Sequence, residues 1–371
     1  MLRYINLFFW SFIVILLSGC EDENLPDDEI CNDQAPLAIT ARNFDMGFTS
    51  WSYGPDEAEV ENTYDFIENH GDIYVEQLDY RIPWNAWRND TALPKEFTDL
   101  VSYKVSHKPS GKKLMLAVSL LNADRTDVIE DYDGLVPDYE SVNDLESAYY
   151  KHLKYVIDEF GPDYLVMAME LNELYDESAP AMWNDSKQML QAVYSNLKMD
   201  FPNLPISVSI TLHNWYLPDD VSDKATYVAD VESFVNGFDF AAISFYAFMK
   251  GLHEEAEFQQ AFDFLHDHTS VPVAISETAY LAETLEIESY NLTILADECE
   301  QYQYLKTLLK NATDHNYLFT IWWAHRDFDK LWETFPEEAK DLGKIWRDTG
   351  LLDENGNLRP AFELWQKVYN L

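Results

Sequence analysis

From residue 43 to its end, the chain alternates short apolar runs with longer segments of helical periodicity. The short runs have the length of β-strands, and the longer segments repeat apolar side chains every three or four positions. The runs that predict strands are Phe44–Thr49, Asp72–Arg81, Lys113–Leu120, Tyr164–Met169, Ile206–Leu212, Phe240–Tyr246, Val271–Ser276 and Leu318–Trp323. The segments that predict helices are Glu57–Asn69, Leu145–Phe160, Ser186–Met199, Tyr227–Asn236, Glu254–His266, Glu298–Ala312 and Pro360–Tyr369.

The order of these elements predicts one α/β domain over residues 41–371, folded as a single (β/α)8 barrel. The strand candidates are mostly apolar, which is typical of parallel strands covered by helices. An open, doubly wound sheet is the structural alternative. We favour the barrel because the sequence has no glycine-rich phosphate-binding turn and because polar residues follow most of the strand candidates.

Two strand candidates end abruptly in acidic residues. The run Tyr164–Met169 is followed by Glu170 and Glu173, and the run Val271–Ser276 is followed by Glu277. In a closed barrel of parallel strands, active sites lie at the C-terminal ends of the strands. Two carboxylates in that place supply the pair needed for acid/base and nucleophilic chemistry on a glycosidic bond.

Charge and aromatic content narrow the class of partner. The formal net charge of -42 argues against nucleic acid or an anionic membrane surface as a partner, and it also disfavours a polyanionic glycan. Aromatic residues make up 15% of the chain, with 11 Trp and 23 Tyr. Part of this content packs the core, and the remainder suits stacking on the apolar faces of sugar rings. We expect a monomer.

Residues 1–19 predict a signal peptide. Arg3 precedes the apolar run Ile5–Leu17, which is too short for a comfortable membrane span. The sequence Leu17-Ser-Gly-Cys20 resembles the lipobox of bacterial lipoproteins, which implies cleavage before Cys20 and attachment of lipid to it. The expected location is therefore the bacterial outer membrane, at its periplasmic face or at the cell surface. A plain signal peptide that happens to end at a cysteine is the alternative.

Residues 20–40 predict an acidic tether between the lipid anchor and the barrel. The stretch Glu21–Ile30 holds most of its acidic residues, and their place behind Cys20 resembles the surface-export signals of some lipoproteins. Cys31 also falls in the tether, and its pairing with Cys299 in a disulfide is left open.

The dipeptides Asn172-Glu173 and Ser276-Glu277, at the ends of the fourth and seventh strands, resemble those of clan A of the glycoside hydrolases. Members of this clan are (β/α)8 barrels that cleave with retention of configuration. The resemblance covers residues 43–370 and is nearest to family 53, the endo-β-1,4-galactanases, and to family 5. It implies a glycosidase that cleaves β-linked polysaccharide or oligosaccharide by double displacement, with endo action favoured over exo and with no cofactor or metal ion.

The resemblance also assigns roles to the two acids. Glu173 is expected to be the acid/base, which must stay protonated, and Glu277 the nucleophile, which must be ionised. Retention requires their carboxyl groups to lie about 5 Å apart. The structural alternative for both is an ordinary carboxylate paired with a nearby basic side chain. Glu170 is a rival on the fourth strand, but its spacing from Glu173 predicts that the two point to opposite faces, and Asn172 directly precedes Glu173.

Further residues are assigned by the same resemblance. Asn172 is expected to hold the sugar 2-OH, and Arg81 to lie beneath Glu277 and keep it ionised. Trp323 is expected to form the floor of the substrate site, although alternation leaves Trp322 as a competitor for that place. The alternative for Arg81 is a surface ion pair.

Other candidates rest on their place at strand ends. Tyr246 is placed to donate a hydrogen bond to Glu277. The remaining strand-end residues that we expect near the cleft, each with a packing or solvated-loop alternative, are His213, Asn214, Trp51, Trp84 and Trp215.

Two other functions compete with a glycosidase. A metal-dependent hydrolase would need histidines at strand ends. His266 and His268 have ligand spacing, but they fall at a helix end on the other side of the barrel. The second is a glycan-binding barrel lipoprotein without catalytic activity, which turnover of a chromogenic β-glycoside would distinguish.

Overall fold

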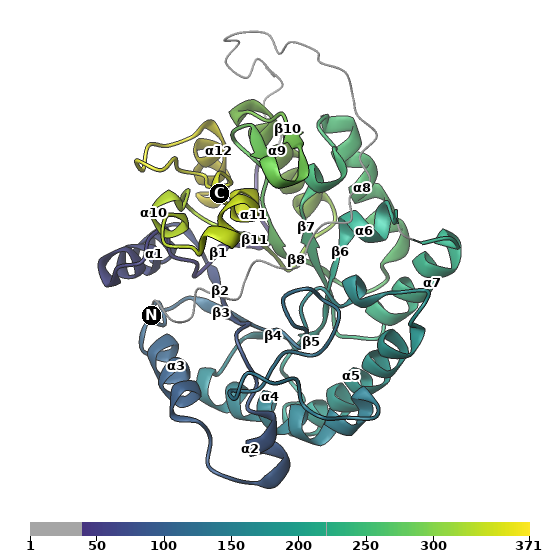
Figure 1. Ribbon diagram of the computed structural model, residues 1–371. Helices are drawn as coiled ribbons and strands as arrows, with labels where there is room; N and C mark the ends of the chain where they lie inside the picture. Colours follow the sequence, from purple (N-terminus) through teal and green to yellow (C-terminus); the bar gives the residue numbers. More distant parts are fainter. Residues whose placement is uncertain (1–38, 220) are drawn as a thin grey trace.

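A parallel sheet surrounded by helices forms the centre of the computed structural model, which describes residues 39–219 and 221–371 (Figure 1). The strand order is β5-β4-β3-β2-β1-β11-β8-β7-β6. The strands of this sheet are β1 (Asp45–Thr49), β2 (Ile73–Leu78), β3 (Lys113–Val118), β4 (Tyr164–Val166), β5 (Ile206–Ser207), β6 (Ser209–Thr211), β7 (Ala241–Phe245), β8 (Val273–Thr278) and β11 (Phe319–Trp322). Each predicted strand is therefore present.

The predicted fifth strand is divided into two pieces, β5 and β6, which flank Val208. β5 pairs with β4, and β6 pairs with β7. Because these two consecutive pieces lie at opposite ends of the strand order, they bring the two ends of the sheet together. The fold is a TIM-barrel-like α/β fold, as the sequence predicts, and the open doubly wound sheet is excluded.

Helices cover the outside of the barrel. The long helices are α1 (Glu57–His70), α3 (Lys95–Ser106), α4 (Glu146–Phe160), α5 (Pro180–Asp200), α7 (Lys224–Val235), α8 (Glu255–His268), α9 (Glu298–Asp314), α11 (Glu337–Arg347) and α12 (Pro360–Tyr369). The short helices are α2 (Trp84–Asn89), α6 (Leu212–Tyr216) and α10 (Asp329–Trp332). A separate antiparallel pair consists of β9 (Leu285–Ile287) and β10 (Leu292–Ile294).

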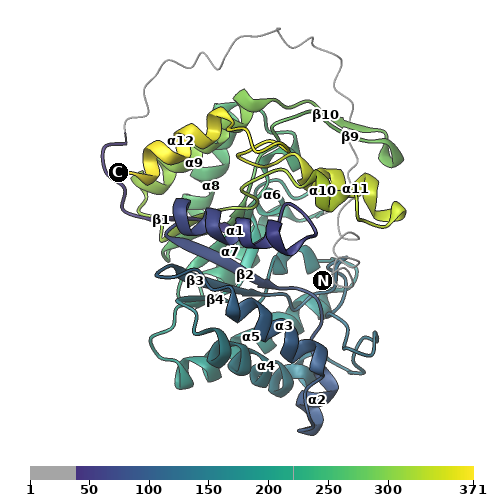
Figure 2. The same cartoon turned by 90° about the vertical axis from the view of Figure 1, so that its left-hand side faces the viewer.

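Local sequence explains where the predicted helices begin. Asp56 and Glu59 form a capping box at the start of α1, and Pro360 occupies the first turn of α12, where its missing N–H costs nothing. In Figure 2, α12 lies beside α9, and the two helices are in contact. The elements that the sequence did not predict are α2, α3, α6, α10, α11 and the β9–β10 pair. In α3 only Phe97 and Val101 are buried, which leaves a weak apolar pattern.

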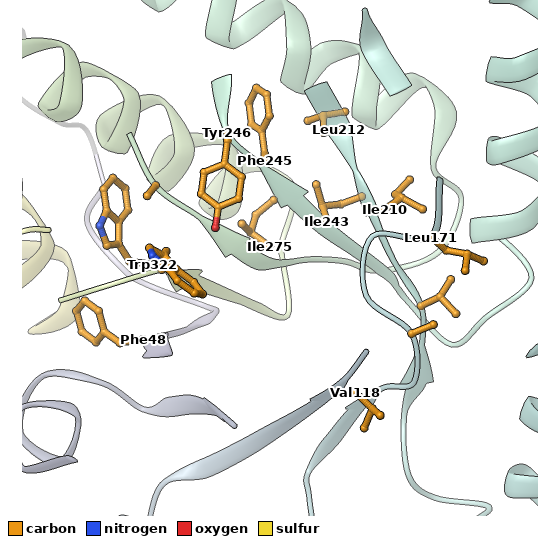
Figure 3. Packing of buried hydrophobic residues seen from close by; sticks show 14 of the residues in the cluster. Phe48, Val118, Leu171, Ile210, Leu212, Ile243, Phe245, Tyr246, Ile275 and Trp322 are labelled. Atoms are coloured by element: carbon orange, nitrogen blue, oxygen red, sulfur yellow. The ribbon is translucent and has the colours of Figure 1, made fainter. Parts of the chain in front are cut away.

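The apolar core has two layers on either side of the sheet. The inner layer consists of Ile73, Val75, Met115, Ala117, Val166, Met169, Phe240, Ala242, Ala274, Phe319 and Ile321. The outer layer lies between the strands and the helices, and Figure 3 shows three of its members, Ile210, Ile243 and Ile275, packed side by side. Burial of each such side chain contributes about 1.5–3 kcal/mol. The two layers fix the strands and hence the positions of the side chains at their C-terminal ends.

The predicted signal peptide, Cys20, and the tether as far as residue 38 lie outside the described residues. Cys299, at the start of α9, is disulfide-bonded, and its partner lies outside the described residues as well. Within the described part of the chain, no helix combines the length and the apolar character needed to span a bilayer.

Candidate active site

A bulge in β8 turns Glu277 into the barrel. Ile243 of β7 pairs with Ile275, but the following residue, Ser244, pairs with Glu277, so Ser276 is an extra residue in β8. Regular alternation would send Ser276 and Glu277 to opposite faces of the sheet. With the bulge, both line one small cavity in the barrel interior.

Two side chains from other strands hold the Glu277 carboxylate. The hydroxyl of Tyr246, which follows β7, donates to Oε1 at 2.5 Å. The amide of Gln77, on β2, donates to Oε2 at 2.5 Å. The hydrogen bond from Tyr246 is the one that the sequence predicts.

Arg81 does not occupy the place beside Glu277 that the resemblance implies. Its guanidinium donates to the carbonyl of Tyr132 at 3.4 Å and lies over the ring of Tyr80, 4.9 Å from the centroid. β2 ends at residue 78, so Arg81 lies in the loop beyond the strand. The residue that β2 presents to Glu277 is Gln77, a neutral amide in place of a cation.

Glu173 follows β4 in a short 3-10 helix, Leu171–Leu174. Its Oε1 accepts hydrogen bonds from the Thr211 hydroxyl and from the Asn214 amide, the latter at 2.6 Å. Both donors come from the end of β6 and the start of α6. Asn214, which the sequence places near the cleft, therefore contacts the candidate acid/base directly.

Asn172 has a different partner from the one implied by the resemblance. Its amide nitrogen donates to the Thr211 carbonyl at 3.1 Å and to the Tyr227 hydroxyl at 3.0 Å, and its oxygen accepts from the Thr211 N–H at 2.7 Å. The side chain is 3% exposed. These bonds occupy its donors and its acceptor, so Asn172 joins the ends of β4 and β6 instead of presenting its amide to a sugar 2-OH.

Glu170 is the third carboxylate of the site. Its Oε2 accepts from Arg125 at 2.8 Å, and its Oε1 accepts from Ser244 at 2.7 Å. Its φ of 51° is left-handed, and the strand geometry has already ended at Val166. The alternation of strand side chains therefore does not extend to Glu173. The prediction that Glu170 and Glu173 point to opposite faces depended on that alternation and no longer applies. Glu170 lines the same small cavity as Glu277.

Burial is the largest influence on the pKa of both Glu277 and Glu173. Burial, followed by the negative charge of Glu170, raises the pKa of Glu277 to about 8, against the hydrogen bonds from Tyr246 and Gln77 and the charge of Arg125. Burial also raises the pKa of Glu173, although Thr211 and Asn214 lower it. The expectation for Glu173 agrees with this direction. Arg81 does not have the expected role of keeping Glu277 ionised, because the neutral Gln77 is the residue of β2 that contacts it.

Aromatic rings form a continuous wall beside the acids. Trp51 lies 5.1 Å from Trp323 between ring centroids, Trp323 lies 6.2 Å from Trp346, and Trp346 lies 4.4 Å from Tyr246. Trp322 instead donates to the Thr349 carbonyl and is fully buried against the helices. Alternation thus separates the two tryptophans, and Trp323 is the one that belongs to the aromatic wall, where it is 3% exposed beneath Trp51 and Trp346.

Two of the expected subsite tryptophans are core residues. Trp84 is fully buried and donates to the Ile129 carbonyl at 2.7 Å. Trp215 is fully buried and donates to the Val228 carbonyl at 3.1 Å. Neither ring is available for stacking on a sugar. His213 is 2% exposed, lies 6.5 Å from the Tyr246 ring, and has its pKa lowered to about 3 by burial, so it is neutral.

Within the described residues, two further groups of acidic side chains are close enough to share a cation. They are Glu283, Asp327 and Glu354, and Asp327, Asp329 and Asp348. Arg359 pairs with Asp327, and Arg347 pairs with Asp348, so arginines already balance much of this charge. At the end of α8, His266 bonds to the Tyr317 hydroxyl and His268 to the Phe264 carbonyl.

Comparison by sequence finds neither a matching protein-family model nor a matching curated protein. Comparison by structure finds glycoside hydrolases. The catalytic domain of an Ignisphaera aggregans GH53 protein is 16% identical, with a TM-score of 0.57, over 91% of this chain and 98% of that one. A GH5_18 variant from Bifidobacterium longum subsp. longum, crystallised in complex with Manβ1-4GlcNAc, is 16% identical, with a TM-score of 0.61, over 88% and 78%. Xylanase 10B from Thermotoga maritima is 12% identical, with a TM-score of 0.57, over 88% and 95%.

The likeness is one of fold. The chain is structurally similar to the barrels of clan A glycoside hydrolases, as the sequence resemblance predicts. Identities this low carry no further conclusion about activity or substrate.

Several side chains of the site escaped the sequence analysis, including Thr211, which donates to Glu173. Gln77, Arg125 and Trp346 come from a strand, a loop and a late helix, and each contacts a residue of the predicted site. A signal existed for Gln77, because it is a polar residue in an otherwise mostly apolar strand. Arg125 and Trp346 lie outside the predicted elements, so no pattern pointed to them.

Proposed function

We propose that this protein is a retaining glycoside hydrolase that cleaves β-linked glycans through a covalent glycosyl-enzyme. The observation that carries the proposal is the bulge-directed Glu277 carboxylate, held by Tyr246 and Gln77. Glu173 and Glu277 are both linked to Glu170: the Glu173 N–H donates to the Glu170 carbonyl, and Ser244, which pairs with Glu277, donates to the Glu170 carboxylate. This arrangement supports a common site for the two carboxyl groups.

The two acids divide the chemistry between them. Glu173 keeps its proton because burial raises its pKa, and it gives that proton to the oxygen of the leaving sugar while the glycosidic bond breaks. Ionised Glu277 forms a bond to the anomeric carbon. In the second step Glu173, now a carboxylate, takes a proton from water, the water oxygen bonds to the anomeric carbon, and Glu277 leaves. Thr211 and Asn214 stabilise Glu173 in its ionised stage.

The substrate is proposed to be an uncharged β-linked polysaccharide or oligosaccharide, cut internally. The net charge of -42 disfavours anionic glycans, and the partly exposed rings of Trp51 and Trp346 suit the apolar faces of sugar rings. The structural likeness to a GH53 catalytic domain, and to a GH5_18 protein bound to Manβ1-4GlcNAc, supports the β-linkage by analogy.

Turnover tests the proposal. Purified protein is incubated with chromogenic β-glycosides and with a panel of neutral plant and algal β-glycans, and released sugars are measured. Glu277→Gln should abolish turnover. Glu173→Ala should abolish it too, and azide should partly restore activity to this variant by replacing water in the second step. Near-normal rates for Glu277→Gln would overturn the assignment of the nucleophile.

A glycan-binding barrel without catalysis is the second candidate. Two observations favour this candidate. The Asn172 amide is already hydrogen-bonded to Thr211 and Tyr227, and the raised pKa of Glu277 disfavours the ionised form that a nucleophile needs. Binding of a β-glycan without turnover between pH 5 and pH 9 would support this candidate instead.

The proposed location rests on the sequence alone. Cleavage before Cys20 and lipid attachment there would anchor the barrel to the outer membrane through the acidic tether. In a detergent phase separation of cells that produce the full chain, the protein should enter the detergent phase, and Cys20→Ala should move it to the aqueous phase.

A further inference from the structure

A pocket of about 520 Å³ opens beside the candidate active site. It lies at the C-terminal ends of β1 and β2, between α1 and α3, which Figure 2 shows on the same side of the barrel. Gln77, which donates to Glu277, is part of its wall. Trp51 of the aromatic wall lines it as well. Gln77 and Trp51 therefore belong both to the pocket and to the candidate active site, and the pocket extends outward from them.

The pocket has apolar walls on several sides. Leu78, Val60 and Leu331 are buried beneath its surface, and Leu100 of α3 faces the space between the helices. They provide apolar surface from four separate elements, and Trp51 adds more from the loop after β1. Pockets of this size with mostly apolar walls and a few polar groups are the usual form of a small-ligand site.

The basic side chain that lines the pocket, Lys104, is already paired with a carboxylate. Lys104 pairs with the buried Glu76 at 2.7 Å, and Glu76 also accepts hydrogen bonds from Ser50 and Tyr64. Among the residues that line the pocket, Lys104 is the one basic side chain. The floor is thus electrostatically balanced and offers no charge to an anion.

Acidic groups face the pocket instead. Burial raises the pKa of Asp79 to about 6, although Lys104 and Arg125 lower it, and Glu57 and Asp99 lie on the rim. A partly desolvated carboxylate gains most from a ligand that donates hydrogen bonds to it. Sugar hydroxyls are such donors, whereas the carboxylate or sulfate of an acidic sugar would be repelled.

We propose that this pocket binds an uncharged sugar unit of the same glycan whose bond is attacked at Glu277. The inference rests on the proposed function and narrows its substrates to neutral glycans of a certain reach. The glycan must be long enough, or carry a suitable branch, for one sugar unit to lie between α1 and α3. The apolar face of that unit packs on Trp51 and Leu100, and its hydroxyls donate to Asp79. Occupation of the pocket contributes to binding, so it acts on KM for extended substrates.

A pocket-filling variant tests this with a matched control on the same helix. Leu100→Trp places a large ring in the pocket, whereas Ser102→Trp places the same ring at an exposed position of α3 that does not line it. Both are made in the Glu277→Gln background and titrated calorimetrically with β-1,4-linked hexasaccharides of glucose, mannose, galactose and xylose. We expect Leu100→Trp to weaken binding of the hexasaccharide that binds best at least tenfold, and Ser102→Trp to leave it unchanged. Equal binding by both variants, or no binding of any hexasaccharide, would overturn the proposal.

Turnover separates a failure of this inference from a failure of the proposed function. With Glu277 intact, Leu100→Trp should reduce kcat/KM for hexasaccharides but not for a chromogenic monosaccharide glycoside, which does not reach the pocket. If the wild-type protein shows no turnover but Leu100→Trp still weakens hexasaccharide binding, the proposed catalytic function is refuted and the proposed sugar-binding pocket is supported. Preference for a hexagalacturonide over every neutral hexasaccharide would refute the neutral class.

Discussion

Glu170 and Glu277 line one cavity in the barrel interior, although Glu170 follows β4 and Glu277 lies on β8, and these strands do not pair with each other. Glu170 is held by Arg125 and Ser244, and Glu277 by Tyr246 and Gln77. The two carboxyls therefore belong to separate hydrogen-bond sets but act on each other through their charges. This relationship makes the protonation of Glu277 sensitive to a residue that donates nothing to it.

Replacing Glu170 by Gln should shift the pH profile of activity to lower pH. The Glu170 charge raises the pKa of Glu277 and of Glu173, so its removal lowers both. Glu277 then ionises at lower pH, and Glu173 loses its proton at lower pH, so both limbs of the kcat/KM profile move in the same direction. Ser244→Ala removes a hydrogen bond to Glu170 but keeps its charge, and its limbs should stay in place. Unmoved limbs in Glu170→Gln would contradict the coupling.

Removing the Tyr246 hydroxyl should weaken catalysis. Tyr246→Phe keeps the ring against Trp346 but removes the hydrogen bond to Glu277. A hydrogen bond to a charged group contributes about 1.5–3 kcal/mol, which corresponds to a roughly 10- to 150-fold loss of kcat/KM. Because that bond lowers the pKa of Glu277, the acidic limb should also move to higher pH. Steady-state kinetics across pH measures both effects, and an unchanged acidic limb would argue against the contact.

The free energy of unfolding should decrease as pH rises because of Glu277. Its folded pKa of about 8 lies above the ordinary value of 4.5, so the folded state binds more protons than the unfolded state between these two values. Stability from this group is therefore lost as pH rises through that window. Glu277→Gln should raise Tm at pH 8 by at least about 2 °C, and by less at pH 4.5. Thermal unfolding at the two pH values checks this, and a larger gain at pH 4.5 would refute the sign.

The register of Glu277 in β8 should be necessary for activity while the Ser276 hydroxyl is not. Inserting one alanine between Ser276 and Glu277 moves Glu277 from its place opposite Ser244 to the next position along the strand, which faces the helices, so turnover should be lost. Ser276→Ala keeps the register and should keep most of the activity. Circular dichroism establishes that both variants are folded. An active insertion variant would show that the register of β8 does not direct Glu277.

Trp84 and Trp51 should separate stability from substrate binding. Trp84→Ala removes a fully buried ring and should cost about 3–5 kcal/mol of unfolding free energy. Trp51→Ala removes a partly exposed ring of the pocket wall and should mainly raise KM. Denaturant unfolding and kinetics on a hexasaccharide distinguish the two, and a reversed pattern would contradict their placement.

The sequence predicts the barrel because each strand is an apolar run of the right length between helical segments. It also predicts the contact between Tyr246 and Glu277, since both follow neighbouring parallel strands. The sequence could not predict that Gln77, and not Arg81, contacts Glu277, because this depends on β2 ending three residues before Arg81. The inward turn of Glu277 depends on a one-residue shift of register, which strand propensity does not contain. Trp84 has the same place in the pattern as Trp51, and only packing against the helices separates them.

The interruption at Val208 ties the integrity of the barrel to the position of one carboxyl group. Residues 206–211 form the segment through which β4 on one side and β7 on the other are joined. Thr211, at the end of this segment, also donates to Glu173. A substitution that changes the path of these residues is therefore expected to disturb strand pairing and the hydrogen bonding of Glu173 together.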